Sequence, residues 1–234
     1  MAAGLDGTRE DQSMPRAEFH KGLQELQDGV LEMGSMVDRQ IERSLQALVD
    51  RDVTLAEAVI RDDDEVNRTR FHLDNMSLSL LAMQAPMASD LRLIIAVLSV
   101  VTDLERMGDH AAGIARIVVT MRGEPLVKPL VDIPRMATVG RKMLSDSLDA
   151  FVQRAPELAY AVGPADDEVD ELQDRVYQDL VAIMVRDPST VEACTHLLWV
   201  AHNLERIADR ATNIAERVVF LVTGMLPEMD VSTY

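Results

Sequence analysis

The chain has 234 residues, of which 47% are hydrophobic and 27% charged, so it is long enough to bury one sizeable core or two small ones. Lysine and arginine number 23 against 40 acidic residues, and the formal net charge of −17 disfavours partners that are themselves anionic. We therefore expect neither nucleic-acid binding nor adsorption to anionic membranes. The aromatic fraction is only 3%, which is typical of helix-on-helix packing and not of sheet proteins.

The cysteine content and the hydropathy pattern favour a location in the cytoplasm. The single Cys194 cannot form an internal disulfide, which favours a reducing environment. No window of the sequence reaches the run of about 18 uncharged apolar residues that a membrane span needs. The first residues are charged and lack an apolar stretch, so we expect no secretory signal there. We expect a cytoplasmic protein without membrane insertion, in which residues 1–14 are disordered.

Hydrophobic periodicity predicts six helices. Apolar residues recur every three or four positions from Phe19 to Leu48, which indicates a first helix of about 30 residues beginning near Pro15. The second helix is expected to start at Asp52 or Thr54 and to end at Gln84, because Pro86 follows. A proline-rich linker is predicted at 124–133. The remaining helices are predicted at 89–122, 134–154, 157–186 and 189–223.

The two halves of the chain repeat each other. Residues 103–119 and 203–219, aligned at an offset of 100, share nine identities in seventeen positions. The preceding helices match as well, since residues 63–66 and 166–169 have the same acidic pattern at an offset of 103. We therefore predict an all-α fold made of two repeated antiparallel three-helix bundles, at 15–123 and 134–225.

Acidic residues lie on the helix seams in both halves. Glu105 falls on the apolar stripe of the third helix, with Asp109 one turn later, and the sixth helix repeats this spacing. A short turn makes the second and third helices of each half neighbours, so their polar pairs can converge. The resulting candidate clusters are Asp63, Asn67, Glu105 and Asp109 in the first half, and Asp166, Asp170, Glu205 and Asp209 in the second.

Carboxylates removed from water must be neutralised, because each costs several kcal/mol unless it is paired. One solution is arginine: Arg106 and Arg206 adjoin the acidic pairs, and Arg70 and Arg92 lie within reach. The other is a metal ion, for which oxygen ligands suit Mg²⁺, Mn²⁺, Fe or Zn²⁺ better than a soft metal. The residues alone leave both solutions open.

The motif of the sixth helix carries a resemblance to a known family. Residues 203–216, which read NLERIADRATNIAE and run on to Gly224, closely resemble the signature of the PhoU family of phosphate-signalling regulators. The first copy, at 102–110, resembles the other half of the family pattern, and the run 85–92 fits it too. The resemblance extends from Phe19 to Gly224, which is nearly the whole chain.

The resemblance implies both an architecture and a chemistry. It implies a pair of three-helix bundles, a spectrin-like duplication, and in some members multinuclear iron or zinc clusters held by the paired Glu-x-x-x-Asp motifs. This sequence departs from the family pattern at Asn67, where an acid is common, and at Gly113, where the second half has Asn213. The first cluster therefore has fewer ligands, and we expect the second to bind metal more tightly.

The resemblance also implies a function. It implies a regulator of phosphate uptake and phosphate-starvation signalling whose partners are the ATPase subunit of the phosphate ABC transporter and the phosphate sensor histidine kinase. The sequence leaves open whether the chain forms a homodimer. Catalysis is not expected, because the sequence lacks a glycine-rich phosphate loop, G-x-S-x-G and H-E-x-x-H. Two alternatives are a metal-dependent carboxylate-bundle enzyme, against which the absence of Glu-x-x-His counts, and a purely structural helical scaffold with salt-bridged acids.

Overall fold

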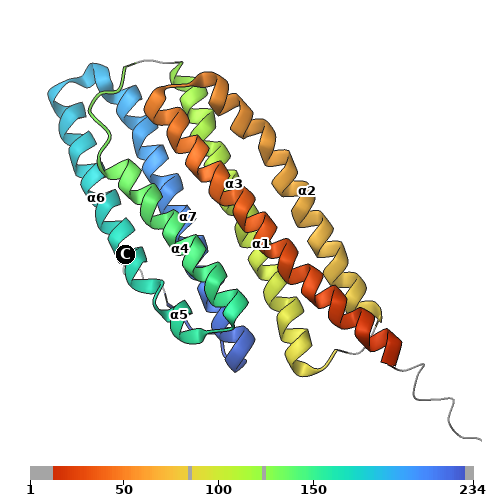
Figure 1. Ribbon diagram of the computed structural model, residues 1–234. Coiled ribbons are helices and arrows are strands. Elements are labelled where there is room, and N and C mark those ends of the chain that lie inside the picture. The colour runs from red at the N-terminus through yellow and green to blue at the C-terminus, as the bar shows by residue number, and fades with distance from the viewer. Residues whose placement is uncertain (1–12, 84–85, 123–124, 230–234) are drawn as a thin grey trace, which may run out of the picture.

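The computed structural model describes residues 13–83, 86–122 and 125–229, and helices make up nearly all of them (Figure 1). No strand occurs within these ranges, so the predicted all-α class is confirmed. None of the helices in the described ranges is long and apolar enough to cross a membrane. The helices are α1 (Ser13–Asp50), α2 (Val53–Met83), α3 (Ala88–Met121), α4 (Asp132–Gln153), α5 (Pro156–Tyr160), α6 (Gly163–Arg186) and α7 (Val191–Thr223).

The helix boundaries agree with the sequence except in one place. The single helix predicted at 157–186 is two helices, α5 and α6, separated by Ala161 and Val162. Pro164 explains the break, because it has no N–H to donate to the carbonyl of Tyr160 and its ring clashes with that carbonyl. The predicted disorder at 1–14 falls outside the described residues except for Ser13 and Met14, which begin α1.

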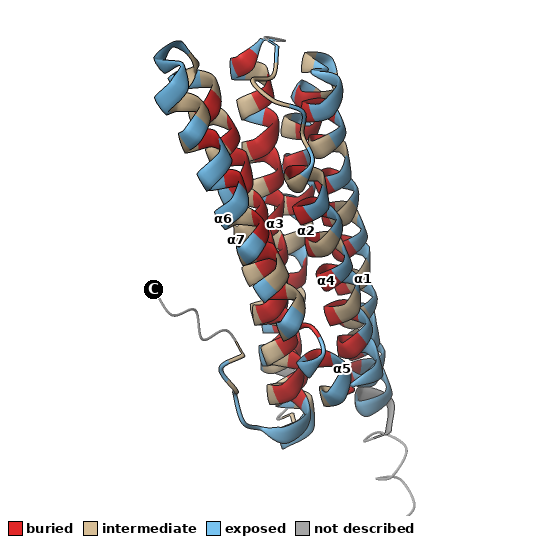
Figure 2. Ribbon diagram, turned by 90° about the vertical axis from the view of Figure 1, so that its left-hand side faces the viewer, coloured by how far each residue is buried: buried red, intermediate tan, exposed pale blue. Residues whose placement is uncertain are grey.

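Four helices form the centre of the molecule and two cover its flanks. α1, α3, α4 and α7 pack together, whereas α2 packs on α1 and α3, and α6 packs on α4 and α7. Figure 1 shows α2 and α6 at opposite edges. Figure 2 shows that the buried positions lie on the inward faces of the helices, as amphipathic helices require.

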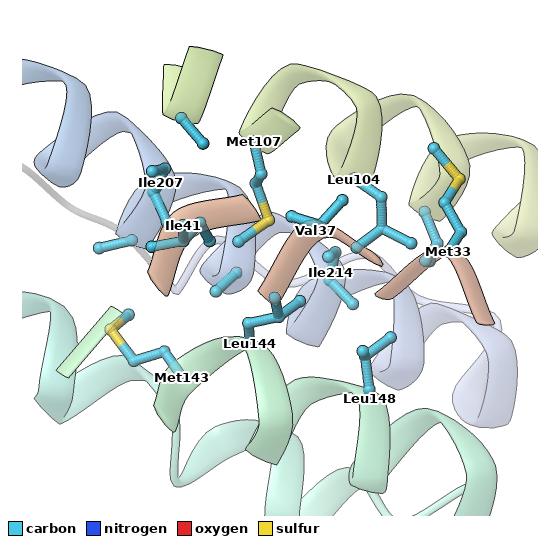
Figure 3. Packing of buried hydrophobic residues seen from close by; sticks show 14 of the residues in the cluster. Met33, Val37, Ile41, Leu104, Met107, Met143, Leu144, Leu148, Ile207 and Ile214 are labelled. Carbon is cyan, nitrogen blue, oxygen red and sulfur yellow. The ribbon is translucent and has the colours of Figure 1, made fainter. Parts of the chain in front are cut away.

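The two repeats share one hydrophobic core. Each fully buried aliphatic side chain there contributes about 1.5–3 kcal/mol. Figure 3 shows side chains from both repeats interleaved at the centre. The core residues labelled in that figure are Met33, Val37 and Ile41 of α1, Leu104 and Met107 of α3, Met143, Leu144 and Leu148 of α4, and Ile207 and Ile214 of α7.

The two motif-bearing helices, α3 and α7, run antiparallel and form the larger of the contacts between the repeats, the other being that of α1 with α4. Arg92 Nε donates to the Leu221 carbonyl (3.2 Å) near the start of α3 and the end of α7. Further along, Arg210 Nη1 lies 3.5 Å from Asp103 Oδ1, and His110 Nδ1 lies 3.0 Å from Asn203 Oδ1. At the offset of 100, Asp103 corresponds to Asn203 and Arg210 corresponds to His110, so the two pairs occupy equivalent positions. The repeats are therefore related by an approximate twofold axis through this interface.

The duplication also includes the first helix of each half, which the sequence comparison did not reveal. Arg51 and Arg154 end α1 and α4 with left-handed φ angles of 56° and 51°, and they are separated by the same offset of 103. The buried Ser44 and Ser147, again 103 apart, each donate to the carbonyl three residues earlier, at 2.8 and 2.9 Å. Each repeat is thus a complete three-helix unit.

Candidate functional site

The first acidic cluster forms where α1, α2 and α3 meet. Asp63 on α2 is buried and accepts a hydrogen bond from Gln40 Nε2 (2.9 Å). Burial raises the pKa of Asp63, the Gln40 hydrogen bond lowers it, and the charge of Asp109 raises it further. Gly108 makes this approach possible, because a Cβ there would lie 3.4 Å from Asp63 Oδ1 and 3.0 Å from Gln40 Oε1. Asp63 on α2 is thus near enough to Asp109 on α3 for the two charges to interact.

An arginine of α2 pairs with Glu105. Arg70 reaches from α2 and donates from Nη1 to Glu105 Oε1 (2.9 Å), and its Nε lies 3.6 Å from Asp74 Oδ2. Asp109, one turn beyond Glu105, has an exposed side chain at the cluster's edge. Partial desolvation and the charge of Glu105 raise the pKa of Asp109, and Arg116 lowers it. Glu105 and Asp109 are thus close enough to repel each other.

The two remaining polar groups of the first cluster differ in what they offer a cation. The half-buried Asn67 donates from Nδ2 to the backbone carbonyl of Asp63 (3.2 Å), which leaves its Oδ1 as its oxygen donor. Gln40 Oε1 is buried and has no hydrogen-bond partner among the described residues. Sequence reasoning missed Gln40, although a glutamine between Val37 and Ile41 on the apolar stripe of the first helix was a usable signal.

The second acidic cluster occupies the equivalent place on α6 and α7. Asp166 is buried and Asp170 is half-buried, one turn later on α6. The repeat offsets relate Asp166 and Asp170 of α6 to Asp63 and Asn67, and Glu205 and Asp209 of α7 to Glu105 and Asp109. All four predicted acids of this half therefore lie on two helices that pack against each other, and their convergence stays a prediction.

The acids of α7 also contact cationic or ionisable side chains. Asp209 Oδ2 lies 2.6 Å from Arg206 Nη1, which is one of the arginines that the sequence proposed as a neutralising group. Glu205 Oε2 lies 3.5 Å from His202 Nδ1. Arg106, the counterpart of Arg206, also lowers the pKa of Asp109, but less than Arg116 does.

The donor set has the chemistry of a hard-cation site, but its arrangement is that of an ion-paired cluster. Carboxylate and amide oxygens are suitable ligands for Mg²⁺, Mn²⁺, Fe or Zn²⁺, and the buried Gln40 Oε1 adds one oxygen without a partner. Within the described part of the chain, no group of three or more His, Cys, Asp or Glu side chains is placed to hold a metal ion. Metal binding at either cluster therefore stays a prediction.

Comparison with known proteins assigns the fold. The PhoU domain model matches this chain twice, at residues 30–118 and 133–218, which is well over half of the chain. The chain belongs to the PhoU family. The double match also confirms the internal duplication, with one PhoU domain in each half.

Relatives and solved structures of the PhoU family cover almost the full length. The chain is 41% identical to a phosphate-specific transport system accessory protein PhoU homolog of Clostridium acetobutylicum over 218 residues, 93% of this chain and 100% of the relative. The crystal structure of PhoU from Pseudomonas aeruginosa matches with a TM-score of 0.85 and 35% identity over 88% of this chain and all of that chain. PhoU from Streptococcus pneumoniae, a phosphate transport system regulatory protein, matches with a TM-score of 0.84 and 32% identity over 90% of this chain and 99% of that chain.

Proposed function

We propose that this chain is a cytoplasmic regulator of phosphate uptake and phosphate-starvation signalling that acts by binding other proteins and not by turnover. The observation that carries this is the full-length similarity to a named accessory protein of phosphate transport, at 41% identity over 100% of that relative. The proposed partners are the ATPase subunit of the phosphate ABC transporter and the phosphate sensor histidine kinase. The net charge of −17 favours association with basic surfaces on these partners.

We further propose that the two carboxylate clusters bind metal, iron or zinc in the first instance, with the second cluster binding more tightly. One difference between the repeats supports this order. The first cluster has Asn67 where the second has Asp170, so the second offers one more anionic ligand. A cation must displace an arginine at either cluster, Arg70 from Glu105 in the first and Arg206 from Asp209 in the second.

The proposed regulatory role is tested by deleting the gene in its source organism and restoring it on a plasmid. A reporter of the phosphate-starvation response should be active in the deletion strain even at high phosphate, and the restored wild-type chain should silence it. If the protein is only a structural scaffold, the reporter should stay silent at high phosphate in the deletion strain. That outcome would overturn the regulatory proposal.

A further inference from the structure

An open groove with aromatic walls lies between α6 and α7. Its volume is about 590 Å³, and its walls include Gln173, Asp174 and Tyr177 of α6. From α7, Trp199 and His202 complete it, with their rings edge-on at 5.7 Å between centroids. Trp199 and Tyr177 are 56% and 57% exposed, although large aromatic side chains are usually buried. Such exposure in a groove is typical of a binding surface.

At the equivalent place of the first repeat, an arginine of the chain itself lies between α2 and α3. The Arg70 guanidinium lies between two carboxylates, with Nη1 2.9 Å from Glu105 Oε1 and Nε 3.6 Å from Asp74 Oδ2. Its Cζ also lies 6.0 Å from the centre of the Phe71 ring, within the range of a cation–π contact. In the first repeat, one guanidinium therefore lies against two acids and an aromatic ring.

The second repeat keeps the acid and the aromatic ring but replaces the arginine. At the offset of 103, Gln173 takes the place of Arg70. The two neighbouring positions exchange their chemistry, because Phe71 and Asp74 correspond to Asp174 and Tyr177. At the offset of 100, Trp199 replaces the small Ser99, which adds a second ring to the groove.

We propose that the α6–α7 groove binds an arginine side chain carried by a protein partner, in the place that Arg70 fills in the first repeat. A planar guanidinium can stack on Trp199 or Tyr177 while it pairs with Asp174. Lysine fits less well, because its compact ammonium neither stacks nor forms paired hydrogen bonds. The net charge of −17 favours the approach of a cationic segment. The inference rests on the proposed function only in that the arginine belongs to a protein.

The groove contains its own reporter, because Trp199 is the only tryptophan of the chain. The full chain is titrated, in the presence of a chelator, with a short amphipathic helical peptide that carries one arginine on its apolar face. Trp199 emission should change and saturate. Matched peptides with lysine or with neutral citrulline at that position should bind about tenfold more weakly, because each loses the stacked or charge-assisted contact. Equal binding of the citrulline peptide would overturn the proposal and indicate an apolar ligand.

A variant that supplies the arginine from within gives the sharper test. Gln173→Arg should place a guanidinium in the groove and weaken peptide binding at least about tenfold, as an occupied site would. Gln178→Arg is the matched control, because Gln178 is exposed on the same helix and does not line the groove. Equal peptide binding by both variants would contradict the proposal.

Two further results distinguish this inference from self-association of the chain and from the proposed regulatory function. Trp199→Ala is expected to leave the sedimentation of the protein alone unchanged, and a change would show that the groove joins copies of this chain. A groove that fails these peptide tests, in a chain that still silences the starvation reporter, overturns the inference and leaves the proposed function intact. Conversely, the chain could bind the arginine peptide saturably while deletion of its gene leaves the starvation reporter silent. That result would support the inference and overturn the proposed function.

Discussion

Arg141 of α4 and Asp38 of α1 bind each other through two parallel hydrogen bonds, Nε to Oδ1 at 2.7 Å and Nη2 to Oδ2 at 2.9 Å. They are 103 residues apart, which is the offset that relates Ser44 to Ser147, so they occupy equivalent places in the two repeats. An ion pair between equivalent positions requires the repeats to differ there, because identical charges would repel. Arg141 Nη1 also donates to Glu42 Oε1 (2.9 Å), and this contact strengthens the joint between repeats.

Replacing Arg141 should loosen the joint between the repeats. Arg141→Met is expected to lower the free energy of unfolding by about 1–2 kcal/mol, since it removes a paired, charge-assisted contact that is only partly exposed. The loss should shrink in high salt, which screens the pairing. Urea unfolding measures it, with Arg135→Met as control, because Arg135 pairs with Glu168 inside the second repeat and is 62% exposed. Equal losses in the two variants would refute the inter-repeat role.

Two glycines inside helices should respond oppositely to alanine. Gly140→Ala should stabilise the protein by up to about 1 kcal/mol through helix propensity, because the nearest atom to the new Cβ is Ile207 Cγ2 at an ordinary 3.6 Å. Gly108→Ala gains the same propensity but crowds the buried Gln40 and Val66, at 3.0 and 3.3 Å, so a net loss of about 1 kcal/mol is expected. Thermal unfolding compares the two, and a stabilised Gly108→Ala would show that α2 and α3 have room to separate.

Asp103 should make stability fall as pH rises. Burial raises the pKa of Asp103 above its ordinary value of 3.8, and Arg210 opposes this only in part. A carboxyl whose folded-state pKa is raised contributes stability fully below its unfolded pKa, and the contribution is lost as pH rises through the folded pKa. Compared with Asp103→Asn, the wild-type chain should therefore lose relative stability between pH 3.8 and neutrality. Urea unfolding of both proteins in a chelator checks this, and a constant difference would contradict it.

The helices and the internal duplication could be predicted, because hydrophobic periodicity and sequence repetition encode them. The spacing of Glu105 and Asp109, repeated at Glu205 and Asp209, identified the duplication that the double PhoU match confirms. The shared core was not predictable, because an apolar stripe shows which face of a helix is buried and not which helix covers it. The α5–α6 break had a signal, Gly163 before Pro164, that the apolar periodicity on either side obscured.

The choice between arginine and metal at the acids was also beyond the sequence. Arg70 was one of several arginines that could reach the acidic pairs. Only the fold shows that its guanidinium pairs with Glu105 and does not extend into solvent. The same applies to Arg206, whose contact is with Asp209 on its own helix. Long side chains have several rotamers, so helix spacing alone limits their partners without selecting one.

Metal content should depend more on the second cluster than on the first. The double variant Glu205→Gln with Asp209→Asn should remove more bound iron or zinc than Glu105→Gln with Asp109→Asn, as measured by elemental analysis of untagged protein. The reason is the extra acid Asp170, which adds an anionic ligand to the second cluster. Arg70→Gln should in turn raise metal binding at the first cluster. Greater loss from the first pair, or no metal in the wild-type chain, would contradict the proposed order of affinities.

The most direct test of the regulatory account is binding of the purified chain to the purified ATPase subunit of the phosphate ABC transporter. Isothermal titration calorimetry should give saturable binding, with a Kd in the micromolar range or tighter, that weakens as salt rises because the chain carries a charge of −17. The same measurement with the cytoplasmic portion of the sensor histidine kinase tests the second partner. Absence of saturable binding to both proteins would contradict the claim that this chain regulates by association.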